Sequence, residues 1–309
     1  MDAGEGKPAE GGGNLRQPHE PPAETARLLK LATWASVAVA SLLIVFKLAI
    51  WLLTGSLSVL ASLVDSLLDV AASLVNLVAV RFSLKSADCD HQYGHGKAES
   101  LAGLGQSLLI GCSAAFVIWR AVDRFVNPRP LEAVGVGVAV MLGAVAITLG
   151  LVLFQRRVVA QTGSTAIKAD SLHYASDLYT NLGTALVLAL AGFGWNWLDP
   201  LVGVVIALVV IHSAWRIGYE AAQILLDHHL SPEAEAEIER LAKGHAKVLG
   251  VHDIRTRRSG QTRIVQLHLE MAGDLSLEEA HRATKEVESF IREMMPQADI
   301  IIHQDPVRK

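Results

Sequence analysis

Six long apolar stretches alternate with short polar segments over the first 222 residues of the chain. Each stretch is long enough to cross a bilayer as a helix, which takes about 20 residues. The stretches cover residues 31–53, 58–82, 99–126, 132–154, 164–193 and 198–221. This pattern predicts an α-helical membrane protein whose residues 28–222 form a bundle of six transmembrane helices.

The pattern changes after residue 222 to that of a small water-exposed domain. Ser231 followed by Pro232 is typical of the start of a helix, and Ser276 with Glu279 predicts a capping box at the start of another. Two alternating stretches around Ser259-Gly260 predict a pair of strands, and ADIIIHQD predicts a final strand. Residues 223–309 are therefore expected to form an αββαβ domain of the α+β class.

The ends and connections of the chain predict its orientation. Residues 1–27 are rich in Gly, Pro and Glu and lack the apolar core of a signal peptide, so we expect a disordered cytoplasmic tail. Basic residues concentrate in the second and fourth connections, whereas the first and fifth have none; Arg129 in the third fits less well. The basic residues are Lys85, Lys97, Arg156, Arg157 and Lys168. Both termini are thus expected in the cytoplasm, in a multi-pass protein of the cell inner membrane.

Composition agrees with a membrane protein. Hydrophobic residues make up 51% of the chain and charged residues 19%, with a mean hydropathy of +0.35. The formal net charge of -4 offers no case for binding nucleic acid. The two cysteines, Cys89 and Cys112, lie beside a loop and in an apolar stretch, so no disulfide is expected.

Four ionisable residues lie inside the predicted bundle. Asp65 and Asp69 are four residues apart, as are His173 and Asp177, so each pair shares one helix face. The two helices run in opposite directions, and the pairs reach similar depths. Together they offer four ligands that suit tetrahedral zinc and related ions, while the absence of thiolates disfavours copper(I). The alternatives are helix–helix contacts or an isolated proton relay.

Other polar residues in the bundle are weaker candidates. Asp170 lies one turn from His173, either at the inner mouth of a site or as a solvated interfacial charge. Asn76 is a further weak candidate. We expect Lys47 to extend toward the membrane surface or to form a structural pair.

Two further groups could bind metal outside the apolar stretches. Asp88, His91 and His95 lie in the second connection, where a solvated loop is the alternative. In the last strand His303 and Asp305 point to the same face. His245, His228 and His229 are expected to be solvated surface residues.

Several of these segments together resemble the cation diffusion facilitator family, in particular its bacterial ferrous-iron and zinc efflux type. The resemblance covers roughly residues 28–307. It rests on LVDSLLDVAASLVNL, ADCDHQYGHGKAESL, KADSLHYASDLYTNLG and the αββαβ order. It implies six helices, a cytoplasmic metallochaperone-like domain for dimerisation, a homodimer, and proton-coupled export of divalent metals.

The resemblance also implies roles for individual residues. The transport site would comprise Asp65, Asp69, His173 and Asp177, with zinc, cadmium or ferrous iron as the cation. A second site would use Asp88, His91 and His95, with Cys89 and Asp90 as possible additional ligands. A binuclear site near the subunit contact would use His252, His268, His281, His303 and Asp305. Lys97 and Asp227 would form a charge interlock that holds the subunits together.

The resulting hypothesis is a proton-coupled antiporter that exports Zn(II), Cd(II) or Fe(II) and carries no prosthetic group. The alternative is a membrane metal sensor that binds without transporting. An intramembrane hydrolase is disfavoured, because the sequence has no HExxH pattern and a fully protein-ligated metal leaves no open coordination position. We therefore do not expect an enzyme.

Overall fold

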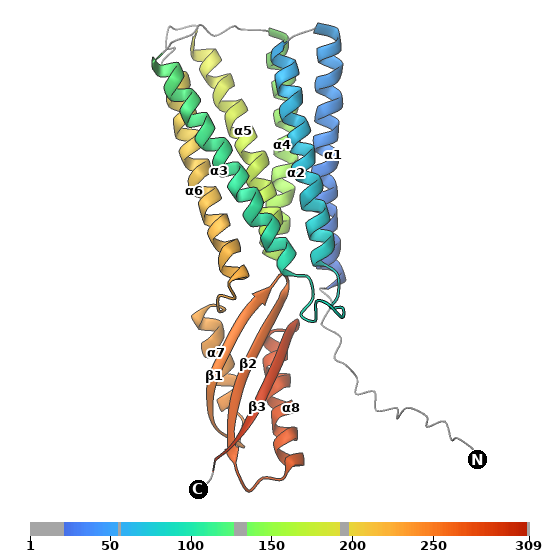
Figure 1. The fold of residues 1–309 in the computed structure, drawn as a ribbon, viewed down its shortest axis with the longest axis vertical. Helices are drawn as coiled ribbons and strands as arrows, with labels where there is room; N and C mark the ends of the chain where they lie inside the picture. Colours follow the sequence, from blue (N-terminus) through green and yellow to red (C-terminus); the bar gives the residue numbers. More distant parts are fainter. Residues whose placement is uncertain (1–21, 55–56, 127–134, 192–197, 308–309) are drawn as a thin grey trace, which may run out of the picture.

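The structure is a computed structural model, which describes the backbone of residues 22–54, 57–126, 135–191 and 198–307. Within these ranges it describes all side chains except those of residues 53–54, 57–62, 64–65, 124, 135–142, 184–191 and 198–199. The described chain forms a long helix bundle with an αββαβ domain at one end (Figure 1).

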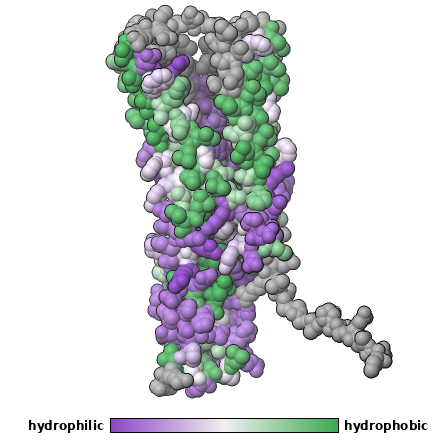
Figure 2. All heavy atoms as spheres, viewed as in Figure 1, coloured by the Kyte–Doolittle hydropathy of each residue, from purple (hydrophilic) through white to green (hydrophobic). Residues whose placement is uncertain are grey.

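Six long helices form the bundle and correspond to the six predicted stretches. They are α1 (Ala23–Thr54), α2 (Leu57–Ser83), α3 (Lys97–Val126), α4 (Gly135–Thr162), α5 (Thr165–Ala191) and α6 (Leu198–Leu225). Large apolar side chains such as Leu68, Trp119 and Leu208 are exposed on the outside of the bundle. The surface view shows a broad hydrophobic region on the upper part of the molecule and a mostly polar lower part (Figure 2). An apolar outer surface of this size suits a lipid environment.

Helix α5 differs from the other five in composition. In the described part of the chain, α1–α4 and α6 are each long and apolar enough to span a membrane, and α5 is not among them. Its first half contains Lys168, Asp170, His173 and Asp177, which lower its hydropathy. Because α5 packs against α3, α4 and α6, its polar residues can contact other helices, and Asp170 is fully buried there.

Three helix ends lie four or more residues beyond the predicted ranges. Helix α1 begins at Ala23, so residues 23–27 are helical although they were predicted as tail. Helix α4 continues to Thr162, eight residues beyond the apolar stretch, and α6 continues to Leu225. Polar residues such as Arg156 and Arg157 are compatible with a helix, so the helix ends predicted from hydropathy alone came too early in the chain. Gly163 terminates α4 with a φ of +61°.

The C-terminal domain has the predicted αββαβ order. It comprises α7 (Pro232–Lys243), β1 (Val248–Ser259), β2 (Thr262–Ala272), α8 (Leu277–Met294) and β3 (Ala298–Val307). The sheet order is β1-β2-β3, with β1 and β2 antiparallel and β2 and β3 parallel. The Ser231 side chain caps α7, and Ser276 and Glu279 form the capping box of α8, as predicted.

Alternation along β2 separates the two faces of this sheet. Val265, Leu267 and Leu269 are buried in a core that also contains Val287 and Ile291 of α8. The intervening residues of β2, including His268, lie on the opposite face. The helices therefore cover one face and leave the histidine-bearing face without a helix.

The turn between β1 and β2 contacts two connections of the helix bundle. A Cβ atom at Gly96 would lie 2.4 Å from the Ser259 carbonyl oxygen, and one at Gly260 would lie 2.8 Å from the Gly96 Cα atom. The Arg258 guanidinium donates a hydrogen bond to the Gly163 carbonyl oxygen at 3.0 Å. The turn is thus packed against the α2–α3 connection and hydrogen-bonded to the α4–α5 connection.

A charged contact lies beside this turn. The Asp227 carboxylate is 2.8 Å from Lys97 Nζ and 3.1 Å from an Arg257 guanidinium nitrogen. Burial opposes ionisation of Asp227, but the hydrogen bonds from Lys97 and Arg257 outweigh it and hold its pKa below the ordinary value. Lys97 and Asp227 therefore form the predicted pair within one chain, whereas their predicted role in holding two subunits together stays a prediction.

Candidate metal sites

Helices α2 and α5 bring three of the four predicted membrane ligands together. One ligand atom each from Asp69, His173 and Asp177 lies within 4.8 Å of the others. His173 Nε2 is 2.9 Å from Asp69 Oδ1, and about one fifth of each of these two side chains is exposed. Asp65 lies one turn before Asp69 on α2, and its side chain is outside the described residues.

This arrangement provides two carboxylates and one imidazole, a donor set that suits zinc and related divalent ions. A hydrogen bond between His173 Nε2 and Asp69 Oδ1 requires a proton on one of these atoms. A metal ion bound between them would replace that proton, because metal ligands must be deprotonated. A proton and a cation would therefore compete for this cluster.

The α2–α3 connection forms a second cluster from Asp88, His91 and His95, whose ligand atoms also lie within 4.8 Å of one another. Asp88 Oδ1 accepts hydrogen bonds from the backbone nitrogens of His91 at 2.7 Å and Asp90 at 3.1 Å. The hydrogen bond from the His91 backbone is the largest cause that keeps the Asp88 pKa below its ordinary value; desolvation opposes this effect, and the charge of His95 adds to it. His95 is buried, with its ring 4.4 Å from that of Phe82. The loop is therefore locally ordered around Asp88.

The additional ligands considered for this loop are not part of the cluster. Cys89 is an exposed free thiol. Asp90 contacts Asp88 through its backbone nitrogen. A cavity of about 450 Å³ opens beside the loop, against the C-terminal domain, with His95, Glu99, Lys285 and Asp299 among its lining residues.

The uncovered face of the C-terminal sheet carries a third group. His252, His268 and His303 are direct neighbours across β1, β2 and β3. The Asp305 carboxylate lies 2.8 Å from His268, 3.2 Å from His252 and 3.4 Å from His303. The hydrogen bond with His268 is the largest cause that lowers the pKa of Asp305. Strand pairing thus gathers four of the five residues predicted for the binuclear site.

One member of this group was not predicted, and one predicted member lies elsewhere. Asp253 clusters with His252 and His268. It has a φ of +50° at an irregularity in the β1–β2 pairing, which re-aims its side chain. Its position next to His252 was the available sequence signal. His281 is exposed on α8, outside both clusters found among the described residues of this domain.

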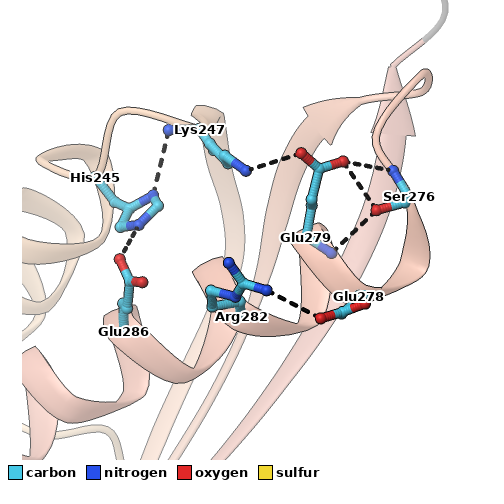
Figure 3. Close-up of polar contacts among 7 residues, drawn as sticks. All are labelled: His245, Lys247, Ser276, Glu278, Glu279, Arg282 and Glu286. Atoms are coloured by element: carbon cyan, nitrogen blue, oxygen red, sulfur yellow. Dashed lines mark hydrogen bonds and ion pairs between the residues drawn. The ribbon is translucent and has the colours of Figure 1, made fainter.

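His245 was expected to be solvated, and this prediction is wrong. Only 10% of its side chain is exposed. Its Nε2 atom lies 2.9 Å from Glu286 of α8, and its Nδ1 atom accepts a hydrogen bond from the Lys247 backbone nitrogen (Figure 3). The turn between α7 and β1 places the ring against α8, where Lys247 and Glu279 form a further contact. His228 and His229 are exposed, as predicted.

Three weaker candidates in the bundle also have defined environments. Lys47 Nζ donates a hydrogen bond to Ser66 Oγ at 2.7 Å, in agreement with a structural pair. Asn76 is buried, with 2% of its surface exposed. Asp170 has no exposed surface, so the alternative of a solvated interfacial charge is wrong. Its surroundings were not predictable from α5 alone, because its partners lie on other helices.

Two protein-family comparisons cover nearly the whole described chain. Residues 33–226 match the family description "Cation efflux transmembrane domain", and residues 230–307 match "Cation efflux protein, cytoplasmic domain". The cation-efflux pump FieF of Shewanella oneidensis is 46% identical over 280 residues, which cover 91% of this chain and 95% of that relative. The FieF pumps of Klebsiella pneumoniae and of Escherichia coli O1:K1 / APEC are each 48% identical over 280 residues, 91% of this chain and 93% of the relative.

Solved structures also match the C-terminal domain. The metal-bound C-terminal domain of the CzcD transporter from Thermotoga maritima is 22% identical. The match covers 25% of this chain and 91% of that one, with a TM-score of 0.24. The two family matches and the curated relatives show that the chain belongs to the cation efflux, or cation diffusion facilitator, family: it is a multi-pass membrane transporter, not an enzyme, with a cytoplasmic C-terminal domain.

Proposed function

We propose that this protein is a proton-coupled antiporter that exports Zn(II), Cd(II) or Fe(II) from the cytoplasm across the inner membrane. The convergence of Asp69, His173 and Asp177 between α2 and α5 carries this proposal. We include Asp65, four residues before Asp69 on α2, as the fourth ligand of the proposed transport site. The names of the relatives, cation-efflux pumps, support export as the direction of transport.

Proton coupling follows from the chemistry of the cluster. The His173–Asp69 contact holds a proton that a bound cation must displace. Cytoplasmic metal enters when the site faces inward, and protons replace it when the site faces outward. An inward proton gradient therefore drives cation efflux, with His173 and the neighbouring carboxylates sharing the titration.

The other two clusters serve as accessory metal sites in this proposal. The cluster of Asp88, His91 and His95 lies in the α2–α3 connection, near the cytoplasmic domain. The group around His268 and Asp305 lies on the open face of the sheet, where a second copy of the chain can bind. We propose a homodimer with both termini in the cytoplasm, in which metal on this face stabilises the subunit contact.

Zinc and ferrous-iron uptake into inside-out proteoliposomes with an imposed pH gradient tests the proposal. Wild type is compared with Asp69→Asn, which keeps the side-chain size but removes the charge. Asp274→Asn, in an exposed loop of the cytoplasmic domain, is the matched control. We expect gradient-dependent uptake in wild type and the control, and loss of uptake in Asp69→Asn.

The outcome separates a transporter from a sensor. Metal uptake that is independent of the pH gradient would refute the proposed proton coupling. Wild-type protein that binds zinc in the bilayer but moves neither metal would favour a membrane metal sensor. Equal uptake by wild type and Asp69→Asn would show that the cluster is not the transport site.

A further inference from the structure

A carboxyl group outside the three metal clusters lies buried at the meeting point of four helices. Asp170 on α5 has 0% of its surface exposed. Its Oδ2 atom lies 2.5 Å from Ser36 Oγ on α1 and 2.6 Å from Gln155 Nε2 on α4. Its Oδ1 atom accepts a hydrogen bond from Gln106 Nε2 on α3 at 3.1 Å. None of these partners belongs to a metal cluster.

All three partners are uncharged, although a buried carboxylate normally requires a cation. Removing an ionised carboxylate from water costs several kcal/mol unless an opposite charge compensates it. Among the described residues, helices α1, α3 and α4 form hydrogen bonds with this carboxyl through the neutral side chains of Ser36, Gln106 and Gln155. Its ionisable neighbours are on α5 itself: His173, one turn away, and the Tyr174 hydroxyl. Asp69 already pairs with His173.

The hydrogen bonds of Ser36 indicate where a proton lies. Ser36 Oγ has three partners within hydrogen-bond distance: the Ala32 carbonyl oxygen at 3.0 Å, Gln155 Nε2 at 2.8 Å and Asp170 Oδ2 at 2.5 Å. A hydroxyl has one hydrogen to donate and two lone pairs to accept. If Asp170 were ionised, both Ala32 and Asp170 would need the same hydrogen. If Asp170 is protonated, Ser36 donates to Ala32 and accepts from the other two, so all three contacts are satisfied.

We propose that Asp170 is a proton-binding site of the transport domain, separate from the metal ligands, and that Oδ2 carries the proton in this conformation. The O–H bond at Oδ2 donates to Ser36 Oγ. When the bundle opens and water reaches this carboxyl, the O–H bond breaks, the proton passes to water, and the carboxylate is hydrated. Asp170 thereby carries one proton in each cycle of opening and closing. That carrier role rests on the proposed antiport, whereas the protonation itself does not.

Infrared spectroscopy of the full chain in lipid bilayers tests the protonation directly. A protonated carboxylic acid gives a C=O stretching band that a carboxylate lacks. At pH 7 we expect this band in wild type and in the exposed-loop control Asp274→Asn, and its loss in Asp170→Asn. Identical spectra of wild type and Asp170→Asn in this region would overturn the proposal.

A second variant keeps the test valid if Asp170→Asn fails to assemble. Ser36→Ala removes the hydrogen-bond acceptor and leaves the carboxyl in place. We expect its band to persist at a shifted position, because the O–H group loses its partner. An absent band, or one at the wild-type position, would contradict the assignment of the proton to the contact between Oδ2 and Ser36.

Vesicle flux then separates this inference from the proposed function. The number of protons exchanged per zinc ion should fall by one in Asp170→Asn, with zinc still transported. The carboxylic acid band together with an absence of zinc flux would support the proton site and refute the antiporter proposal. Proton-coupled flux without the band would leave the antiporter standing and refute the site.

Discussion

Replacing Gly96 by alanine tests how the cytoplasmic domain is held against the helix bundle. The new methyl carbon would lie 2.4 Å from the Ser259 carbonyl oxygen and 2.9 Å from the Gly260 nitrogen. Both are backbone atoms, so no side-chain rotation relieves the overlap and the turn must move away. Forcing a carbon atom into a packed contact typically costs about 1–3 kcal/mol. Taking about 2 kcal/mol, the equilibrium for opening this contact shifts roughly 30-fold, since about 1.4 kcal/mol is a factor of ten.

Amide hydrogen exchange of the full chain measures this opening. Local opening exposes amides in proportion to its equilibrium constant, so peptides covering residues 83–97 and 258–262 should exchange faster in Gly96→Ala. Peptides from the core of the sheet should exchange as in wild type, because the substitution lies outside that core.

Gly94→Ala is the matched control in the same loop. Gly94 has a φ of +77°, but a Cβ atom there would lie no closer than 3.8 Å to its nearest neighbour. It therefore adds backbone strain of about 1–2 kcal/mol without pushing on the turn. Unchanged exchange at residues 258–262 in Gly96→Ala, or an equal increase in Gly94→Ala, would refute the packing argument.

Other predictions concern the cytoplasmic domain and its contact with the bundle. Asp305→Ala should weaken zinc binding at the sheet cluster by at least about tenfold, because this carboxylate contacts three histidines. Titration calorimetry measures the zinc affinity, with Asp274→Asn as the control. Equal affinities of the two variants would exclude Asp305 as a ligand. The pKa of Asp227 is lowered in the folded chain. Its stabilising contribution to the contact with Lys97 and Arg257 is therefore complete above the ordinary aspartate pKa, and it is lost as the pH falls through the lower pKa of the folded chain. Exchange at residues 258–262 should therefore rise below about pH 4 in wild type, and an identical pH profile in Asp227→Asn would contradict this. Ile291 is fully buried, and Ile291→Ala should destabilise the domain by about 2–5 kcal/mol; a thermal unfolding midpoint within error of wild type would show that its packing is not needed.

Local periodicity explains why much of the molecule was predictable. The clustering of Asp69, His173 and Asp177 follows from their spacing along the helices. The two helices are antiparallel, and both ligand pairs lie the same number of residues from the inner membrane surface. The order of the cytoplasmic domain follows from local signals such as the capping box at Ser276 and the alternation of apolar residues along β2. Each of these signals involves residues within a few positions of one another.

The missed features depend on residues far apart in the chain. Asp170 could be read as solvated or buried until Ser36 and Gln106, which are 134 and 64 residues away, were placed around it. The place of Asp253 in the sheet cluster goes with its positive φ at the irregular strand pairing. The tight contact between Gly96 and Gly260 joins two domains, and neither glycine alone indicates its partner.

The β1–β2 hairpin provides a physical connection between the metal clusters. His252 and His268 lie on its two strands. His252 is seven residues from Ser259 in the turn, which is a distance of roughly 23 Å along the strand at about 3.3 Å per residue. Its turn packs directly after His95 of the loop cluster, through Gly96. The same turn holds Gly163, two residues before the start of α5, through Arg258. A paired strand ladder is stiff compared with a loop, so a displacement of the sheet moves both connections together. The helix that carries the membrane cluster is therefore joined mechanically to the sheet that carries the cytoplasmic one.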